Sequence, residues 1–282
     1  MDRRMTEPAP GRILVGTSGF SYDDWLGSWY PPGMPKRAML DFYADRFPAL
    51  EVNATYYRTP APSTARRMVE RAAGRLRFAI KAPGELTHKG LAGPGVVLPF
   101  REFLEPFAEA GCLGPVLLQF PAGFVYTRDN LLYLHIAVGQ LAGLPLAVEL
   151  RSGTWDAEPA RRAADELDAV RVAVDQPAVR GVSASLTEAA EGPFAYYRFH
   201  GRNAGAWYGS EDRHGRYNYR YGREELEALA REVRKGAPRA QSTYVFFNNH
   251  PDGNAAHNAG QLGAMLGLPP PPESPRDLFE DA

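Results

Sequence analysis

Most of the side chains that could do chemistry in this sequence stand at the ends of short apolar runs. Lys81 ends one run, Glu149 lies near the end of another, and His200 ends a third. An amine, a carboxylate and an imidazole held a few ångströms apart can exchange protons with a substrate. We therefore take Glu149, Lys81 and His200 as the candidate catalytic residues of metal-free acid/base chemistry, with Glu149 as general acid or base.

Other polar and aromatic residues follow the same runs and are the candidate ligand-binding residues. Guanidinium groups suit carboxylates and phosphates, and aromatic rings can stack on sugars. We therefore expect a small anionic ligand, bearing phosphate or carboxylate and including sugar-like compounds. The candidate ligand-binding residues are Ser18, Tyr22, Asn53, Tyr56, Gln119, Arg151, Asp175, Arg198, Trp207, Asn248 and His250.

Some of these charges also have a structural interpretation. Glu149 and Arg151 are two positions apart, so they share one face of an extended chain, and that face points either into the site or towards the helices. In the second case the pair is a structural salt bridge. Lys81 and Asp175 are likewise compatible with a pair that neutralises itself across the fold.

A metal site is the alternative to metal-free chemistry. His200 and His250 end consecutive runs, and with Glu149 and Asp175 they would form a mixed set of imidazole and carboxylate ligands. However, the sequence has no HExxH, CxxC or His-x-His spacing, which are the patterns that indicate metal sites more specifically. We therefore expect neither a metal nor another cofactor.

The elements that must position these residues repeat along the chain. Short apolar runs are each followed by a turn signal and a helical pattern, which is typical of βα units around a parallel sheet. The crossover at 177–192 has the weakest helical pattern. Eight strands are expected at 12–16, 50–53, 76–81, 116–120, 146–150, 170–175, 196–200 and 244–248, with helices at 37–46, 62–73, 99–110, 128–141, 159–167, 223–235 and 254–266.

Eight such units favour a single-domain α/β protein, a (β/α)8 TIM barrel, over an open doubly wound sheet. The phosphate-loop patterns GxGxxG and GxxxxGK[ST] are absent, and the length of 282 residues suits one barrel. We expect a flexible N-terminus at 1–11, the barrel domain at 12–268 and a Pro-rich acidic tail at 269–282. The site then lies at the C-terminal ends of the strands.

Composition excludes some classes of partner. The formal charge of −1 argues against a generally basic coat for nucleic acid or membrane surfaces. No run is apolar enough for a signal peptide or a membrane span. Cys112 is the only cysteine, so no intramolecular disulfide can form, and we expect a cytoplasmic protein without a membrane partner. Nothing in the sequence indicates the oligomeric state.

Several ordered motifs resemble the YecE-like family, domain of unknown function 72. The similarity covers about residues 12–266, and it implies a TIM barrel without an established activity. One small departure is Ala122 after Phe120-Pro121, where a second proline is common. The motifs are GTSGFSYDDW (16–25), LEVNATYYRTP (50–60), FAIK (78–81), LGPVLLQFP (113–121), VELRSGTW (148–155), YRFHGR (197–202) and YVFFNNH (244–250).

Three functions are compatible with the sequence. The first is an enzyme of the hydrolase or lyase class that acts on the anionic ligand. The second is a nucleic-acid binding protein or metal-dependent phosphodiesterase that uses the basic, aromatic segment from Arg202 to Arg220; six histidines in the whole chain weaken the metal version. The third is a non-catalytic ligand-binding protein.

Overall fold

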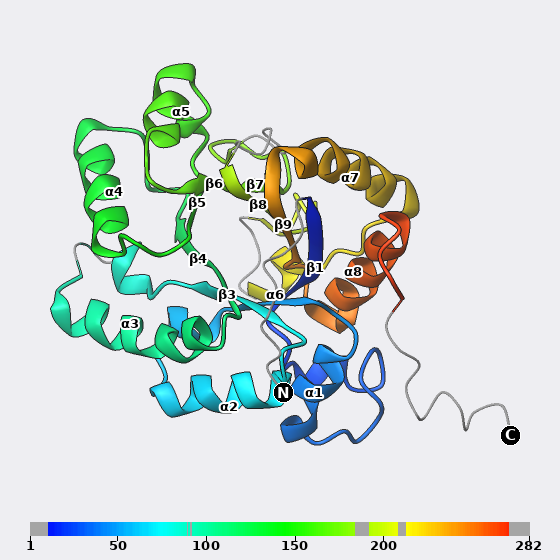
Figure 1. Ribbon diagram of the computed structural model, residues 1–282. Coiled ribbons are helices and arrows are strands. Elements are labelled where there is room, and N and C mark those ends of the chain that lie inside the picture. The colour runs from blue at the N-terminus through cyan, green and yellow to red at the C-terminus, as the bar shows by residue number, and fades with distance from the viewer. Residues whose placement is uncertain (1–10, 89, 91, 184–191, 208–212, 271–282) are drawn as a thin grey trace, which may run out of the picture.

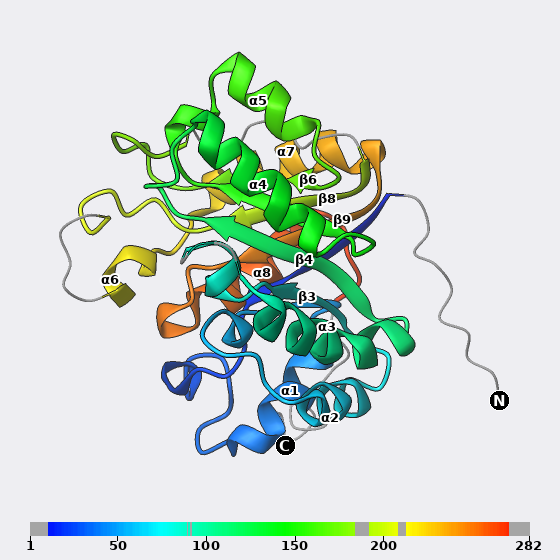
Figure 2. The ribbon, with the colours of Figure 1, turned by 90° about the vertical axis from the view of Figure 1, so that its left-hand side faces the viewer.

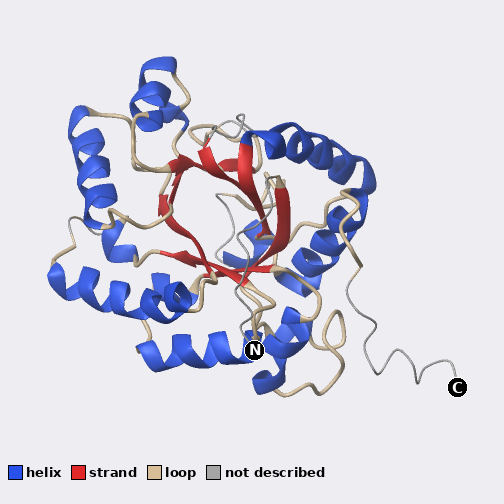
Figure 3. Ribbon diagram, viewed as in Figure 1, coloured by secondary structure: helices blue, strands red, loops and turns tan. Residues whose placement is uncertain are grey.

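Nine parallel strands form the central sheet of the computed structural model, which describes residues 11–88, 90, 92–183, 192–207 and 213–270 (Figures 1 and 3). The order around the sheet is β6-β5-β4-β3-β2-β1-β9-β8-β7. The strands are β1 Arg12–Ser18, β2 Ala49–Val52, β3 Arg77–Lys81, β4 Leu113–Phe120, β5 Leu146–Leu150, β6 Val170–Arg171, β7 Ala173–Asp175, β8 Gly192–Phe199 and β9 Ala240–Phe247.

The nine strands correspond to the eight predicted ones, because β6 and β7 are two parts of one predicted strand. Only Val172 separates them, and its backbone N–H donates to the carbonyl oxygen of Val148 at 2.9 Å. β6 pairs with β5, and β7 pairs with β8. The two parts therefore join the two ends of the sheet, and the expected TIM-like barrel is confirmed.

Helices surround the barrel (Figure 1). Proline occupies the first turn of α2, α3 and α5, where its missing N–H is not needed. The seven predicted helices are all present, and their bounds agree with the prediction to within two residues, except that α3 begins five residues earlier than expected. They are α1 Lys36–Ala44, α2 Pro62–Ala72, α3 Pro94–Glu109, α4 Arg128–Gln140, α5 Glu158–Asp165, α7 Arg223–Gly236 and α8 Asn254–Met265.

Two segments near the barrel end differ from a regular βα pattern. α6 (Arg213–Tyr217), a short helix that the sequence pattern did not predict, lies beyond the end at which the strands finish (Figure 2). In the weak crossover after β7, the described residues 176–183 contain no helix. The expected N-terminus and tail lie outside the described residues, except for Gly11, Pro269 and Pro270.

The barrel interior is apolar at its lower levels. Because side chains alternate along each strand, every second residue points inward and the others pack against the helices. A continuous cluster of inward residues fills this space, and it consists of Leu14, Ala49, Ala79, Leu117, Ala147, Val170, Val172, Val174, Phe194, Tyr196, Tyr244 and Phe246. The next inward position along most strands is polar, and these positions form the candidate site.

Candidate functional site

A layer of polar side chains lies above the apolar cluster, at the C-terminal ends of the strands. Each member stands two or four residues beyond an inward-facing residue of the same strand, so the alternation that buries the cluster also turns these side chains inward. We call this set the polar layer. It consists of Ser18, Glu51, Lys81, Gln119, Glu149, Arg151, Arg198, His200 and Asn248.

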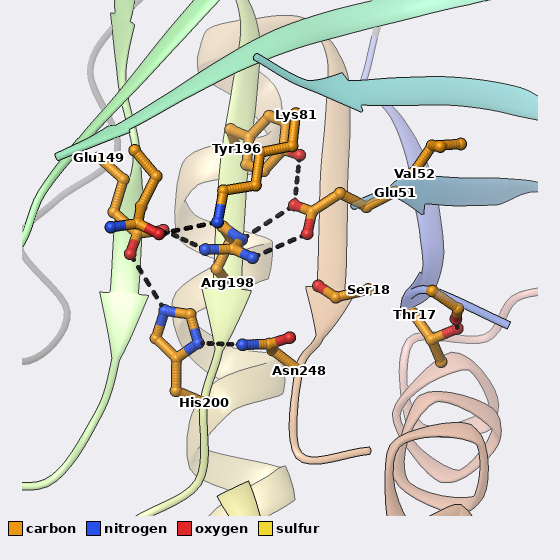
Figure 4. Close-up of polar contacts among 12 residues, drawn as sticks. Thr17, Ser18, Glu51, Val52, Lys81, Glu149, Tyr196, Arg198, His200 and Asn248 are labelled. Atoms are coloured by element: carbon orange, nitrogen blue, oxygen red, sulfur yellow. Dashed lines mark hydrogen bonds and ion pairs between the residues drawn. The ribbon is translucent and has the colours of Figure 1, made fainter. Parts of the chain in front are cut away.

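Arg198 connects two carboxylates from separate strands (Figure 4). Its Nε and Nη2 donate to the two oxygens of Glu51 at 2.9 and 2.7 Å, and its Nη1 donates to Oε2 of Glu149. Tyr196 donates its hydroxyl to Oε2 of Glu51 at 2.7 Å. All four side chains are buried. Buried charges are tolerated when they are paired in this way, so Arg198 holds β2, β5 and β8 in a fixed arrangement.

Glu149 is an ionised carboxylate with three cationic or polar neighbours. Besides Arg198, the Nε of Arg151 donates to Oε1 at 2.6 Å, and Nε2 of His200 lies 3.3 Å from the same oxygen. Burial by itself would raise the pKa of Glu149, but Arg198 and Arg151 lower it well below its usual value. The Glu149–Arg151 pair therefore faces the barrel interior and is also a salt bridge. Glu149 is a weak proton acceptor at neutral pH.

His200 lies between Glu149 and Asn248 (Figure 4). The Asn248 amide nitrogen is 2.9 Å from Nδ1, so Nδ1 accepts this hydrogen bond and the neutral ring carries its proton on Nε2, facing Glu149. Burial lowers the pKa of His200 to about 4, against the opposing effect of Glu149. The imidazole is therefore neutral at physiological pH.

We expect His200 to keep this protonation state across a wide pH range. In a nitrogen-detected NMR titration, its ring signals should show the Nε2–H tautomer and stay constant from about pH 8 to about pH 5.5, because its pKa is about 4. The same residue in urea-unfolded protein should titrate near pH 6.5, which provides the control. Titration near 6.5 in the folded protein would contradict this arrangement.

Lys81 differs from the other cations of the polar layer because it forms no ion pair within the described part of the chain. Its Nζ donates to Oε1 of Gln119 at 2.9 Å and lies 4.3 Å from the ring centroid of Tyr56. No carboxylate among the described residues forms an ion pair with it. Burial first, and then the charges of Arg198 and Arg151, lower the pKa of Lys81 to about 7. At neutral pH, Lys81 is therefore a mixture of amine and ammonium.

Aromatic side chains surround the polar layer on the loop side. Tyr22 stacks on His250 with ring centroids 4.6 Å apart, and its hydroxyl donates to the carbonyl oxygen of Ser18. Tyr217 of α6 lies 6.0 Å from the His250 ring. Its hydroxyl accepts a hydrogen bond from Arg151 at 3.3 Å. Burial would raise the pKa of Tyr217, but Arg151 reverses this effect and lowers it.

The structure brings most of the predicted site residues together, but not Asp175. Inward-facing Val174 precedes Asp175, so the carboxylate points to the outer side of the barrel. There it accepts hydrogen bonds from Nε of Arg202 and from the hydroxyl of Tyr221, both at 2.9 Å. The alternative of a Lys81–Asp175 pair is therefore not found.

The remaining candidates lie near the polar layer. Asn53 follows β2, and its Oδ1 is buried without a hydrogen-bond partner among the described residues. Tyr56 lies against Lys81. Trp207 is buried beside Tyr217, with ring centroids 6.4 Å apart, so it supports α6 rather than lining the polar layer directly.

Three contributors were missing from the predicted site: Glu51, Tyr196 and Tyr217. For Glu51 a signal existed, because it stands two residues before Asn53 and therefore shares its face of β2. Tyr196 has the same relation to Arg198. Tyr217 had no comparable signal, since it reaches Arg151 from an unpredicted helix.

No group of three or more His, Cys, Asp or Glu side chains in the described part of the chain is arranged to hold a metal ion. None of the described helices combines the length and the apolar character needed to cross a membrane.

Comparison with known proteins establishes the family. A family model described as "Protein of unknown function DUF72" matches residues 14–277. The chain belongs to the DUF72 family. The curated UPF0759 protein YunF of Bacillus subtilis is 27% identical over 286 residues, which cover 94% of this chain and 99% of YunF.

Solved DUF72 structures have the same fold. A DUF72 protein of Thermotoga maritima is 34% identical, with a TM-score of 0.83 over 91% of this chain and 99% of that chain. A DUF72 protein of Enterococcus faecalis is 28% identical, with a TM-score of 0.82 over 91% of this chain and 96% of the other. The YecE-like resemblance and the barrel fold are thereby confirmed.

Proposed function

We propose that this DUF72 protein is an enzyme that acts on a small carboxylate- or phosphate-bearing compound at the polar layer, with Lys81 as the group that exchanges a proton. The observation that carries the proposal is the environment of Lys81, a desolvated amine that forms no ion pair within the described residues and lies near two arginines. Groups with such perturbed pKa values are common at functional sites, and proton exchange is most effective when the pKa is near the working pH.

The charge balance of the polar layer supports an anionic ligand. Arg198 and Arg151 are offset by Glu51 and Glu149, so protonated Lys81 supplies the remaining positive charge. An anion near Lys81 would complete the balance and favour the ammonium form, so binding is expected to raise the pKa of Lys81.

The other candidate catalytic residues are less suited to transfer a proton. Glu149 remains ionised because of its two arginines, and His200 remains neutral because of burial. We assign them to positioning: Glu149 orients Arg151, and His200 holds Glu149 from the other side. Arg151 keeps 11% of its side chain exposed, against 1% for Arg198, so it is the guanidinium that a ligand can reach.

Anion binding to wild-type protein can be measured by titration calorimetry with inorganic phosphate and with lactate. At pH 8, in buffers of different ionisation enthalpy, we expect uptake of about one proton per bound anion, because Lys81 becomes protonated. Arg151→Gln should weaken binding on the order of tenfold, the loss expected for one charge-assisted hydrogen bond. Lys81→Met should abolish the proton uptake.

Arg223→Gln is the matched control, since Arg223 is exposed on α7 and pairs only with Glu227 among the described residues. Its affinity should equal that of the wild type. If neither anion binds, or if Arg151→Gln binds both as the wild type does, the proposal is wrong.

Little supports the nucleic-acid alternative. Arg202 is paired with Asp175 and Glu225, and the guanidinium of Arg216 lies 5.2 Å from the ring centroid of Trp207. Two arginines of the basic segment therefore already have partners within the protein. A non-catalytic anion-binding protein would share the binding results above and differ by the absence of turnover.

A further inference from the structure

Lysine is rare in this chain, and one of its few copies lies inside the barrel. The sequence has 32 Lys and Arg residues, of which only Lys36, Lys81, Lys89 and Lys235 are lysines. Lys36 and Lys235 are exposed and pair with Asp23 and Glu232, and Lys89 lies outside the described residues. The two other interior cations, Arg151 and Arg198, are guanidinium groups. The position of Lys81 thus holds the one type of cation that can become a nucleophilic amine.

We propose that Lys81 is a nucleophile that forms a Schiff base with the carbonyl group of a small oxo acid. The inference rests on the proposed function and names its substrate class. It is supported by the hydrogen bond to an amide oxygen rather than a carboxylate, because an ion pair would hold the amine in its protonated, unreactive form.

The amine form of Lys81 is available at neutral pH. With a pKa of about 7, roughly half of Lys81 is unprotonated at pH 7, whereas an exposed lysine is unprotonated to the extent of about 0.04%. Lys81 as a whole residue is partly exposed rather than fully buried.

The arrangement around Lys81 suits an oxo acid in particular. Gln119, which accepts the hydrogen bond from Lys81, is in register with Glu149, and Arg151 follows Glu149 on the same face of the chain. A carboxylate bound by Arg151 would bring an adjacent carbonyl carbon towards Nζ. The ionised Glu149 would then stabilise the positive charge of a protonated imine.

The chemistry needs no other reactant. The lone pair of Nζ forms a bond to the carbonyl carbon, and the electron pair of the C–O π bond moves to oxygen. The oxygen leaves as water with the two protons that the amine loses, and a C=N bond remains. Once protonated, this imine withdraws electrons from the neighbouring carbon, which is the step that carbon–carbon lyases require.

Reductive trapping tests the inference. Wild-type protein is incubated with pyruvate and sodium borohydride, and the modified lysine is located by peptide mass mapping. We expect one reduced adduct on Lys81, at least about tenfold above Lys36 and Lys235, with a rate that rises through pH 7 as the amine forms. Lys81→Arg keeps the charge without the nucleophile and should lose the adduct, whereas Lys36→Met should retain it.

Parallel calorimetry with pyruvate and lactate separates this inference from the proposed function. Lactate carries the same carboxylate but no carbonyl group. If both compounds bind and pyruvate is not trapped on Lys81, or is trapped equally on the exposed lysines, the Schiff base is wrong and the anion site stands. If neither compound binds but phosphate does, the Schiff base is wrong and the anion site stands. If phosphate also fails to bind, the proposed function is wrong and the Schiff base fails with it.

Discussion

Replacement of Arg198 by methionine is expected to lower the free energy of unfolding by about 3–5 kcal/mol, the largest loss that we predict for this chain. The physical reason is that Glu51 and Glu149 would remain inside the barrel without the guanidinium that neutralises both. Urea denaturation at pH 7, followed by tryptophan fluorescence and circular dichroism, measures the change.

The loss should shrink as the pH falls. In the wild type, Arg198 lowers the pKa of both carboxyl groups, so their contribution is present above about pH 4.3 and is lost on acidification. In Arg198→Met, burial without a counterion raises these pKa values, so the variant is destabilised as the pH rises through them. The two stability curves should therefore approach each other as the pH falls, from the raised pKa values of the variant down to the lowered pKa values of the wild type.

Exposed Arg223, which pairs with Glu227 on α7, provides the matched control. Arg223→Met should cost no more than about 0.5 kcal/mol. A triple variant that combines Arg198→Met with Glu51→Gln and Glu149→Gln should recover part of the loss, because no buried charge remains. An Arg198→Met variant as stable as Arg223→Met would show that the ion pairs do not form in solution.

Replacement of Lys81 by methionine is expected to have the opposite sign and to raise the free energy of unfolding at pH 6 by about 2 kcal/mol. Holding the ammonium in the fold costs at most about 5 kcal/mol, given the pKa change from 10.5 to about 7. Removal of the amine also leaves Oε1 of Gln119 without its donor, which offsets about 1–3 kcal/mol. Chemical denaturation of both proteins at pH 6 provides the measurement.

Lys81 also makes the stability of the wild type depend on pH. Below pH 7, Lys81 is protonated in the folded and the unfolded protein, and the cost is fully present. Between about 7 and 10.5 only the unfolded protein holds the proton, so the stability of the wild type rises with pH through this window. Lys81→Met should lack that rise, whereas exposed Lys36→Met should retain it. If Lys81→Met is less stable than the wild type at pH 6, the fold does not hold the Lys81 ammonium at a cost, and the prediction is wrong.

Strands and helices were predictable because each carries a local signal. The strands are short, buried runs such as Leu146–Leu150, and the helices follow turn signals and proline starts. The break at Val172 has no such signal, since it depends on β6 and β7 pairing with different neighbours. For α6 the pattern is too short to detect among loop residues.

The membership of the site was predictable only in part, because the sequence does not say which face of a strand points inward. Asp175 and Glu51 illustrate the problem: both are acidic residues near strand ends, yet one faces Arg202 outside the barrel and the other Arg198 inside. The assignment of catalytic roles was harder still. Glu149 is unsuitable as a base because Arg198, which is 49 residues away in the chain, lowers the pKa of its carboxyl group.

The ion pairs of Arg198 also have a consequence for the order in which the barrel forms. Glu51 and Glu149 are synthesised before Arg198, which is separated from Glu51 by 147 positions. A growing chain that ends before β8 has two carboxylates and no central guanidinium, so desolvation opposes early closure around them. We therefore expect these contacts to form late on the folding pathway, so that their loss accelerates unfolding more than it slows folding.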